Sequence, residues 1–305
     1  MWDVLTGFVV VGLAIVVGYI LGRIDLLGAH ARPVLSRLTF YVLSPFLLFT
    51  VLAQADVAVL FSALLSVSAI SAVVVITVQA LLARLVWRRS AADTVVSALS
   101  AGQVNSNNIG IPLSLYLLGS AAFPAPVILL QLLVFTPVAL AILDSATTGE
   151  RSITRIARRT VTNPIVLGSL LGALVSVSGV ELPPVVMEPA LLLANACVPV
   201  MLISYGMSLY GQRVLSTAGR RGEVLTASVL KLLVMPAIAW ATATLFGLSG
   251  PQTLVVVVLA GLPTAQNVFN YAQRYGVSET VSRDTILITT VGCIPILIGL
   301  VLILG

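Results

Sequence analysis

The sequence predicts an all-α integral membrane protein in which ten transmembrane helices form two inverted repeats of five. Three observations lead to this fold class. Hydrophobic residues make up 59% of the 305 residues and charged residues only 9%, whereas a soluble domain carries about 25% charged residues. Apolar stretches near the length of about 20 residues that spans a bilayer recur along the whole chain. Basic residues lie in alternate connections between them. A soluble enzyme, a disulfide-stapled secreted domain and a disordered chain are thereby excluded.

Each apolar stretch is predicted to be helical, because an open strand cannot satisfy its backbone hydrogen bonds in hydrocarbon. The first stretch lacks the basic start of a signal peptide and is expected to remain as the first span. Spans 1 to 5 are expected near residues 4–22, 38–54, 57–83, 94–119 and 125–143, and spans 6 to 10 near residues 163–180, 189–210, 224–247, 252–274 and 284–304.

The arginines predict how the chain is oriented. Every arginine lies in one of the connections 1–2, 3–4, 5–6, 7–8 and 9–10, and none lies in an even-numbered connection. Basic connections face the cytoplasm, so both termini are expected outside a cell membrane. Because topology accounts for the excess of 16 basic over 11 acidic residues, no nucleic-acid surface is expected.

Residues 144–162 form the longest polar segment and are predicted to be a cytoplasmic linker. They separate a first five-helix repeat, residues 1–143, from a second, residues 163–305. An odd number of spans in each half inverts one half relative to the other, as in many transporters. Internal similarity favours this arrangement. The matched features are Ala101-Gly102 with Ala260-Gly261, Pro45 with Pro199, and Pro137 with Pro295.

Spans 4 and 9 are predicted to be broken near the middle of the membrane. Span 4 contains AGQVNSNNIGIP (101–112), and span 9 contains AGLPTAQNVFN (260–270). Glycine, proline and carboxamide side chains together favour a broken helix. Unwound backbone at this depth is tolerated only where it lines a cavity or is buried in protein. Interrupted spans in corresponding positions of two halves therefore indicate a transporter site.

The chemistry of these two segments favours a small organic anion. Pro112 suits the first position of a half-helix, whose N-terminus offers N–H donors and about half a positive charge. Carboxamides add further donors, while their oxygens also suit a sodium ion near Asn105 and Gln266. The opposing interpretation is that the amides join neighbouring helices, at about 0.6 kcal/mol each. The candidate substrate-binding residues are Asn105, Asn107, Asn108, Gly110, Pro112, Pro263, Thr264, Gln266, Asn267 and Asn270.

Lys231 is the only lysine and lies within span 8. It is interpreted either as a structural lysine that snorkels to the cytoplasmic side, or as a charge that attracts or balances an anion. No acidic residue falls deep in a span, and no hydrolase motif is present, so neither an enzyme nor a cofactor is expected. Cys197 and Cys293 lie in apolar runs and are expected to be unpaired.

Several motifs follow one another in a specific order: Ser44-Pro45, NSNNIGIPL (105–113), Asn163-Pro164, the segment 198–206, KLLVMP (231–236) and LPTAQNVF (262–269). In these motifs the chain resembles the auxin efflux carrier family, which includes plant PIN-type carriers and bacterial malate and malonate permeases, within the bile acid:sodium symporter-like superfamily. The resemblance implies a scaffold domain of spans 1, 2, 6 and 7 and a transport domain of spans 3–5 and 8–10. It also implies that broken spans 4 and 9 cross at the substrate site and that the scaffold forms a homodimer.

The resemblance adds Ser44 and Pro45 to the candidate site. In plant members an asparagine in the first of the two crossing spans, span 4, holds the substrate carboxylate. This asparagine matches Asn105. The proline before it is replaced here by Val104, and the second crossing carries Gln266 and Asn267, as in bacterial members. These departures weigh against auxin itself as the substrate.

The sequence therefore predicts a secondary transporter that moves small organic anions by elevator-type alternating access. The alternatives are a sodium-coupled organic-anion symporter and, in another class, a passive channel or receptor. The expected partners are the anionic substrate, the lipid bilayer and a second copy of the chain.

Overall fold

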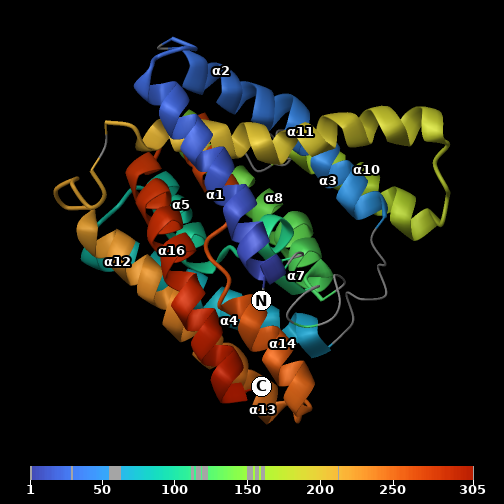
Figure 1. The fold of residues 1–305 in the computed structure, drawn as a ribbon, viewed down its shortest axis with the longest axis vertical. Coiled ribbons are helices and arrows are strands. Elements are labelled where there is room, and N and C mark those ends of the chain that lie inside the picture. The colour runs from blue at the N-terminus through green and yellow to red at the C-terminus, as the bar shows by residue number, and fades with distance from the viewer. Residues whose placement is uncertain are drawn as a thin grey trace.

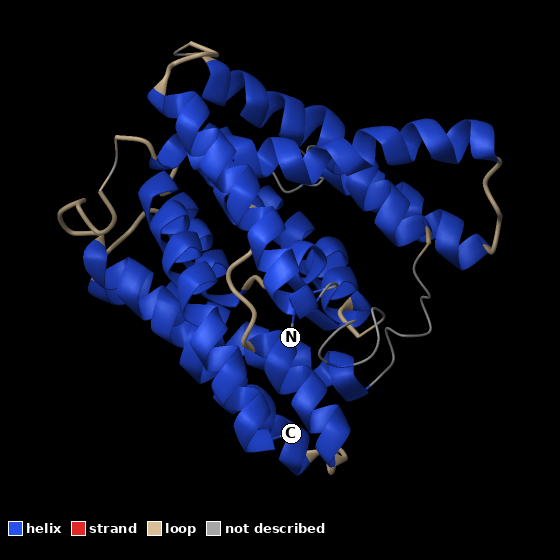
Figure 2. Ribbon diagram, in the orientation of Figure 1, coloured by secondary structure: helices blue, strands red, loops and turns tan. Residues whose placement is uncertain are grey.

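The computed structural model describes residues 2–28, 30–54, 63–110, 113, 114, 118, 123–149, 154, 158, 162–211 and 213–304. All regular structure in these residues is helical apart from one isolated β-bridge (Figure 2). The predicted all-α class is confirmed.

Local sequence signals mark helix ends in the first half of the chain. Ser90 precedes the helix at Ala91, and its Oγ accepts the N–H of Asp93 at 3.1 Å, which satisfies one of the free amides of the first turn. The helix that follows ends at Gly102. The segments are α1 (Trp2–Arg23), α2 (Ala31–Leu38), η1 (Thr39–Leu43), α3 (Ser44–Ala53), α4 (Ala63–Leu81), η3 (Leu82–Val86), α5 (Ala91–Gly102), η4 (Ser106–Gly110), α7 (Ala125–Leu130), η5 (Gln131–Phe135) and α8 (Thr136–Thr148).

Similar local signals delimit the helices of the second half. Asn163 accepts the N–H of Ile165 at 3.0 Å and precedes Pro164, which suits the first helical position. Gly276 ends a helix in the left-handed conformation, at φ 66°. The segments are α10 (Pro164–Ser178), α11 (Pro184–Leu209), α12 (Arg221–Val229), η6 (Leu230–Val234), α13 (Met235–Leu245), α14 (Gly250–Ala260), α15 (Asn267–Tyr275) and α16 (Glu279–Leu304).

Three of the π-helical turns share one sequence feature. In η1, η5 and η6 the turn ends two residues before a proline, namely Pro45, Pro137 and Pro236. A proline has no N–H to donate to the preceding turn, and widening that turn by one residue accommodates the gap. By contrast, Pro199 and Pro295, which match Pro45 and Pro137 in the sequence, lie inside continuous helices. The matched spacing did not predict this difference.

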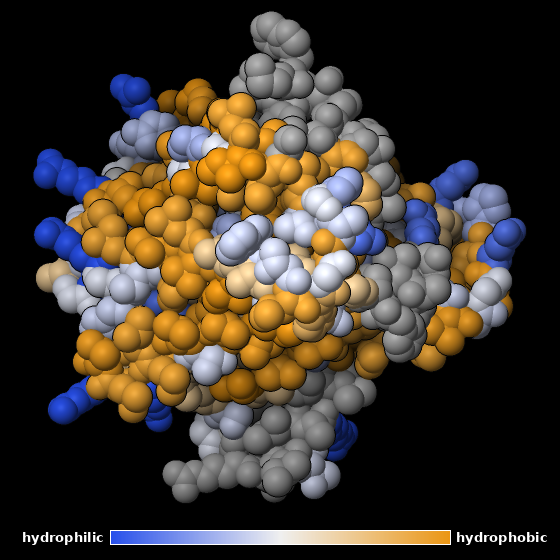
Figure 3. Space-filling model, turned by 90° about the horizontal axis from the view of Figure 1, so that it is seen from below, coloured by the Kyte–Doolittle hydropathy of each residue, from blue (hydrophilic) through white to orange (hydrophobic). Residues whose placement is uncertain are grey.

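Six helical segments in the described residues are long and apolar enough to cross a membrane. Large apolar side chains are exposed along them, as for Leu302, which is 80% exposed. Figure 3 shows such residues over most of one face, with hydrophilic side chains projecting at its margins. Exposed apolar surface of this extent suits lipid rather than water. The six segments are Ala31–Ala53, Ala63–Val86, Ala125–Thr148, Pro184–Leu209, Arg221–Leu245 and Glu279–Leu304, and the shorter apolar helices are Gly12–Arg23, Pro164–Ser178 and Gly250–Ala260.

Some predicted helix boundaries are wrong, because residues predicted to lie in loops or in the linker belong to helices. Arg32 and Arg37 belong to α2 rather than to a loop, and Arg283 belongs to α16. The predicted linker starts inside α8, which continues to Thr148. A hydropathy pattern records how polar the residues are and not whether they are helical. Charged residues that continue an apolar helix past the membrane are therefore mistaken for a loop.

Helix α11 packs closely on α1 and on α3, and α3 packs closely on α10. Helices α2, α3, α10 and α11 lie in the upper part of Figure 1, and α12, α13, α14 and α16 in the lower part. Glycines permit the close approach. A methyl group on Gly206 would overlap the backbone of Ile15 in α1, and one on Gly168 would overlap the backbone of Pro45. Small residues at helix contacts are typical of membrane proteins, where packing rather than hydrophobicity drives association.

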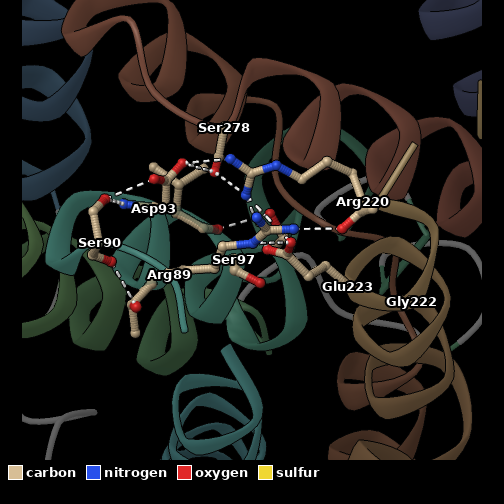
Figure 4. A network of polar contacts seen from close by, with 12 residues as sticks. Arg89, Ser90, Asp93, Ser97, Arg220, Gly222, Glu223 and Ser278 are labelled. Atoms are coloured by element: carbon tan, nitrogen blue, oxygen red, sulfur yellow. Dashed lines mark hydrogen bonds and ion pairs between the residues drawn. The ribbon is translucent and has the colours of Figure 1, made fainter. Parts of the chain in front are cut away.

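An ion network ties together three segments that are far apart in the sequence (Figure 4). The Glu223 carboxylate is fully buried and accepts from Arg89 Nε at 2.6 Å and from Arg220 Nη1 at 3.2 Å. Arg220 Nη2 also donates to Asp93 at 3.0 Å, and Ser278 Oγ donates to the same carboxylate at 2.6 Å. The network therefore fastens the starts of α5 and α12 to the turn before α16.

We expect this network to weaken in acid. Burial alone would raise the pKa of Asp93, but hydrogen bonds from Ser278 and Ser90 and the Arg220 guanidinium lower it below the ordinary 3.8. A carboxyl group with a lowered pKa stabilises the fold above its ordinary pKa, and this contribution is lost as the pH falls through the folded pKa. The melting temperature of the purified protein should therefore fall below about pH 4, and less steeply for Asp93→Asn. An equally steep fall in that variant would contradict the assignment.

Candidate functional site

Two helices end where the matched Ala-Gly pairs occur. The first, α5, ends at Gly102, and α14 ends at Ala260 with Gly261 as its cap. A methyl group on Gly102 would overlap the side chain of Ile76, so α4 packs directly on this helix end. The predicted interruptions are both present, at the predicted residues.

The segments that follow these helix ends cross each other. Val104 and Thr264 form an isolated antiparallel bridge. Asn105 N–H donates to the Pro263 carbonyl at 2.9 Å, and Ala265 N–H donates to the Gln103 carbonyl at 3.2 Å. Backbone groups released by each broken helix are thus satisfied by the other, which is how non-helical backbone is tolerated inside a membrane protein.

Thr264 fixes the second segment to the helices around it. Its Oγ1 donates to the Ser100 carbonyl at 2.7 Å, and its N–H donates to Thr289 Oγ1 at 3.1 Å. Thr264 itself is fully buried. The hydrogen bonds of this candidate residue therefore position the crossing.

Gln131 fixes the first segment and is not among the residues predicted from the sequence. Its Oε1 accepts Val104 N–H at 2.6 Å, and its Nε2 donates to the Val104 carbonyl at 3.1 Å and to Ser106 Oγ at 3.4 Å. The side chain comes from the π turn η5, a feature that often occurs at functional sites. The available signal was a single carboxamide in the otherwise apolar run at 125–135.

A pair of amides spans the crossing. Asn105 Nδ2 donates to Gln266 Oε1 at 2.7 Å, and the two residues are 3% and 1% exposed. One amide comes from each broken span, so this hydrogen bond joins the two halves of the chain at the point predicted to bind substrate.

A pocket opens beside this amide pair. One wall is made by the crossing and α15, with the polar groups of Asn105, Gln266 and Asn267. The opposite wall comes from α3, α10 and α11, and is largely apolar. No charged side chain occurs among the described residues that line the pocket. The lining residues are Ser44, Leu47, Leu48, Val51, Val104, Asn105, Ser106, Ile128, Gln131, Leu132, Ile165, Cys197, Met201, Ala265, Gln266, Asn267 and Tyr271.

Four of the predicted site residues line this pocket: Ser44, Asn105, Gln266 and Asn267. Ser44 Oγ lies 3.6 Å from the thiol of Cys197, which is free and buried, as Cys293 also is. Asn267 Nδ2 donates to Tyr271 OH at 3.2 Å. The sequence therefore located both polar segments of the pocket but not Gln131 or the apolar wall.

Other predicted residues lie elsewhere. Asn270 is one turn further along α15, where its Oδ1 accepts from Ser36 Oγ at 3.5 Å. Pro45 packs its backbone against Gly168, and Gly110 lies beside Leu262. Pro263 contributes its carbonyl to the bridge. The side chains of Asn107 and Asn108, and Pro112 as a whole, lie outside the described residues.

The helical turn after the first crossing begins earlier than Pro112. It is the π turn η4, in which Gly110 N–H donates to the Asn105 carbonyl at 3.0 Å. Ser106 N–H donates to the Val104 carbonyl at 2.8 Å. The predicted start of the outer half-helix at Pro112 lies outside the described residues.

Lys231 points to the second broken helix. It is fully buried, and its Nζ donates to the Ala260 carbonyl at 2.7 Å and contacts Met235 Sδ at 3.1 Å. The predicted snorkelling to the membrane surface is not seen. Ala260 is the last residue of α14, where the helix dipole is negative, so an amino group here stabilises the carbonyl end of the helix.

We expect Lys231→Met to lower stability rather than substrate affinity. The substitution leaves a buried carbonyl at Ala260 without its donor, at a cost of about 1–3 kcal/mol. Because Lys231 does not line the pocket, binding of a carboxylate should change by less than about 3-fold. Melting temperature and equilibrium binding measure the two effects separately. An unchanged melting temperature with lost binding would instead make Lys231 a charge partner of the anion.

Comparison with known proteins agrees with these features. The sequence model of the family described as "Membrane transport protein" matches residues 3–153 and 138–301. A protein of Rhizobium meliloti (strain 1021) named "Putative malonate transporter" is 32% identical over 147 residues, which are 48% of this chain and 45% of that protein. The chain thus aligns with less than half of that relative.

Two further relatives extend the comparison. An "Uncharacterized transporter" of Methanothermobacter thermautotrophicus is 28% identical over 259 residues, 82% of each protein. A rice protein (Oryza sativa subsp. japonica) named "Probable auxin efflux carrier component 1b" is 25% identical over 153 residues, 48% of this chain and 27% of that protein. The resemblance drawn from the motifs is confirmed: the chain belongs to the membrane transport protein family, the family of auxin efflux carriers and malonate-type permeases, and is a multi-pass membrane protein.

Proposed function

We propose that this chain is a secondary transporter for small organic anions that carry a carboxylate. The observation that supports this most strongly is the amide pair Asn105–Gln266, which joins two broken spans and lines the pocket beside them. Carboxamides offer N–H donors to an anion without a charge of their own. As a transporter, the protein catalyses no chemical conversion of its substrate.

The walls of the pocket suit a small acid with an apolar part. A carboxylate is accommodated on the amide side, because no acidic side chain among the described lining residues repels it. Leu47, Leu48, Ile165 and Met201 on the opposite wall fit a short hydrocarbon body. Malonate, named in the Rhizobium meliloti relative, is a small dicarboxylate whose apolar part is a single methylene.

The packing supports an elevator mechanism. Helices α1–α3, α10 and α11, which are spans 1, 2, 6 and 7 of the predicted ten, form the scaffold domain of the proposal. The remaining helices form the transport domain, held as one body by the crossing and the Glu223 network. The pocket lies between these two groups, so sliding one past the other exposes it to each side in turn. The scaffold is also the proposed face of a homodimer.

The proposed orientation has a direct test. Thr148→Cys at the end of α8 should react with a membrane-impermeant maleimide only from the cytoplasm, and Val180→Cys after α10 only from outside. Both positions are exposed, whereas Cys197 and Cys293 are buried, so the unmodified chain gives the background. The reverse pattern would overturn the orientation inferred from the arginines, in which both termini lie outside a cell membrane.

A thermal-shift screen tests the substrate class. A ligand that binds the native state raises its stability by RT ln(1 + [L]/Kd), about 2.7 kcal/mol at 100 times Kd. We expect small mono- and dicarboxylates to raise the melting temperature, with and without sodium, and amines of the same size not to. If only cations or amines raise it, the proposed function is wrong.

A further inference from the structure

A second hollow lies between α2 and α15, apart from the central pocket. It is lined by Arg32, Pro33, Ser36, Arg37, Gln273, Arg274 and Glu279. Three guanidinium groups meet there with one carboxylate. Arg32 Nη2 pairs with Glu279 at 3.3 Å, which leaves two positive charges in the hollow without a balancing acid among the lining residues.

Arg274 is held in place by aromatic rings. Its guanidinium lies 5.6 Å from the ring centre of Phe40, 4.9 Å from that of Tyr41 and 5.8 Å from that of Tyr275. It also donates to Tyr41 OH. Cation–π contacts of this kind orient a charge that would otherwise sample many rotamers. One cation of the hollow is thus preorganised.

Hydrogen-bond donors in and beside the hollow lack acceptors. Arg32 Nε is buried and has no hydrogen-bond partner among the described residues, and the exposed Arg37 has neither an ionic nor a hydrogen-bond partner there. Asn270 is 3% exposed, and its Nδ2 is likewise unpartnered, while its Oδ1 accepts from Ser36 of the hollow. A buried donor without an acceptor costs about 1–3 kcal/mol, so the two beside this hollow, Arg32 Nε and Asn270 Nδ2, indicate an acceptor that the protein does not supply.

We propose that this hollow is an oxyanion site, which binds a carboxylate or a phosphate group. Charge-assisted hydrogen bonds from guanidinium groups are the interaction that such groups favour. Topology explains why arginines are frequent on this side, but not why three converge from α2 and α15 around unpartnered donors. The ligand is either a soluble anion or the headgroup of an anionic lipid.

The site is separate from the central pocket but connected to it along one helix. Asn267 lines the pocket, Asn270 contacts the hollow through Ser36, and Arg274 lines the hollow. Residues at this spacing lie on one face of α15, about 10 Å from first to last. For a soluble anion the hollow is a waiting position between the cytoplasm and the pocket. The waiting position rests on the proposed function and orientation, whereas the oxyanion site itself does not.

Binding of radiolabelled malonate to the full chain in phosphatidylcholine nanodiscs tests the site. The assay uses an Asn105→Asp background, which isolates the hollow from the central pocket. Arg37→Gln should weaken the remaining binding about 3- to 10-fold, because it removes one charged donor in a partly exposed site. Arg213→Gln is the matched control, since Arg213 is exposed, is predicted to face the same side and lies outside the hollow. It should change binding by less than about 2-fold.

A second arm identifies a lipid ligand. Nanodiscs that contain phosphatidylglycerol are exchanged into phosphatidylcholine, and retained phosphatidylglycerol is measured by native mass spectrometry. Retention that falls in Arg37→Gln but not in Arg213→Gln supports the site with a lipid as its ligand, and Arg37-dependent malonate binding supports it with a soluble anion. If Arg37→Gln and Arg213→Gln agree in both arms, the oxyanion site is refuted. Equal malonate binding by wild type and Asn105→Asp would instead refute the central pocket alone.

Discussion

Replacing Asn105 by aspartate is expected to abolish malonate binding at the central pocket while leaving the protein folded. The side chain is 3% exposed and its amide donates to Gln266, so a carboxylate at this position retains a partner if the Gln266 amide turns to donate. The new negative charge then lies where the carboxylate of the substrate is proposed to sit. Like charges at close range in a site of low dielectric repel strongly, so affinity should fall more than about 100-fold. Equilibrium binding to monodisperse protein is the measurement.

Two further variants make this result specific. Asn105→Ala removes one hydrogen bond to a charged group, worth about 1.5–3 kcal/mol, and should weaken binding about 10- to 150-fold. Asn163→Asp is the matched control, because it adds the same charge at the N-cap of α10, where aspartate caps as well as asparagine. Its binding should equal that of wild type. Folded Asn105→Asp protein with wild-type affinity would remove Asn105 from the site.

Adding one methyl group at Gly206 is expected to remove most folded protein. The new carbon would overlap the Ile15 carbonyl and lie 2.9 Å from Tyr19 N, so α1 and α11 would have to separate. Because the colliding atoms belong to the backbone and cannot move aside, the cost should reach at least about 3 kcal/mol, the upper part of the overpacking range. Fluorescence-detected size-exclusion chromatography and the melting temperature report the loss.

Gly12→Ala is the matched control for this packing prediction. Gly12 lies in α1 as well, with no atom within 4 Å of the position that its methyl group would take. Alanine is about 1 kcal/mol better than glycine in a helix interior, so this variant should be neutral or slightly stabilising. If both variants behave alike, the close contact between α1 and α11 does not limit stability.

The parts of the fold that sequence reasoning predicted are those with a local cause. Apolar runs predicted where helices lie, and Gly102 and Gly261 predicted where two of them stop, because glycine and the following polar residues act within one turn. Arg32 and Arg37 were misplaced in a loop, since a helix that continues beyond the apolar run has no local composition signal.

The parts that could not be predicted depend on contacts between distant residues. Gln131 reaches Val104 across 27 positions, and Glu223 pairs with Arg89 across 134. Nothing near Glu223 in the sequence distinguishes it from a solvated acid, yet it is fully buried. The candidate site was predicted in part because Asn105, Gln266 and Asn267 lie in the interrupted segments themselves, whereas the apolar wall comes from three other helices.

Counterflow of labelled malonate into proteoliposomes tests the central claim most directly. Vesicles loaded with unlabelled malonate should take up label transiently above equilibrium, with saturable initial rates, and Asn105→Asp vesicles should show only the background of protein-free vesicles. Carrier transport through a pocket that is exposed to one side at a time predicts this overshoot. Flux that rises linearly with malonate concentration, or an overshoot of equal size in Asn105→Asp, would contradict an alternating-access carrier built around the two broken spans.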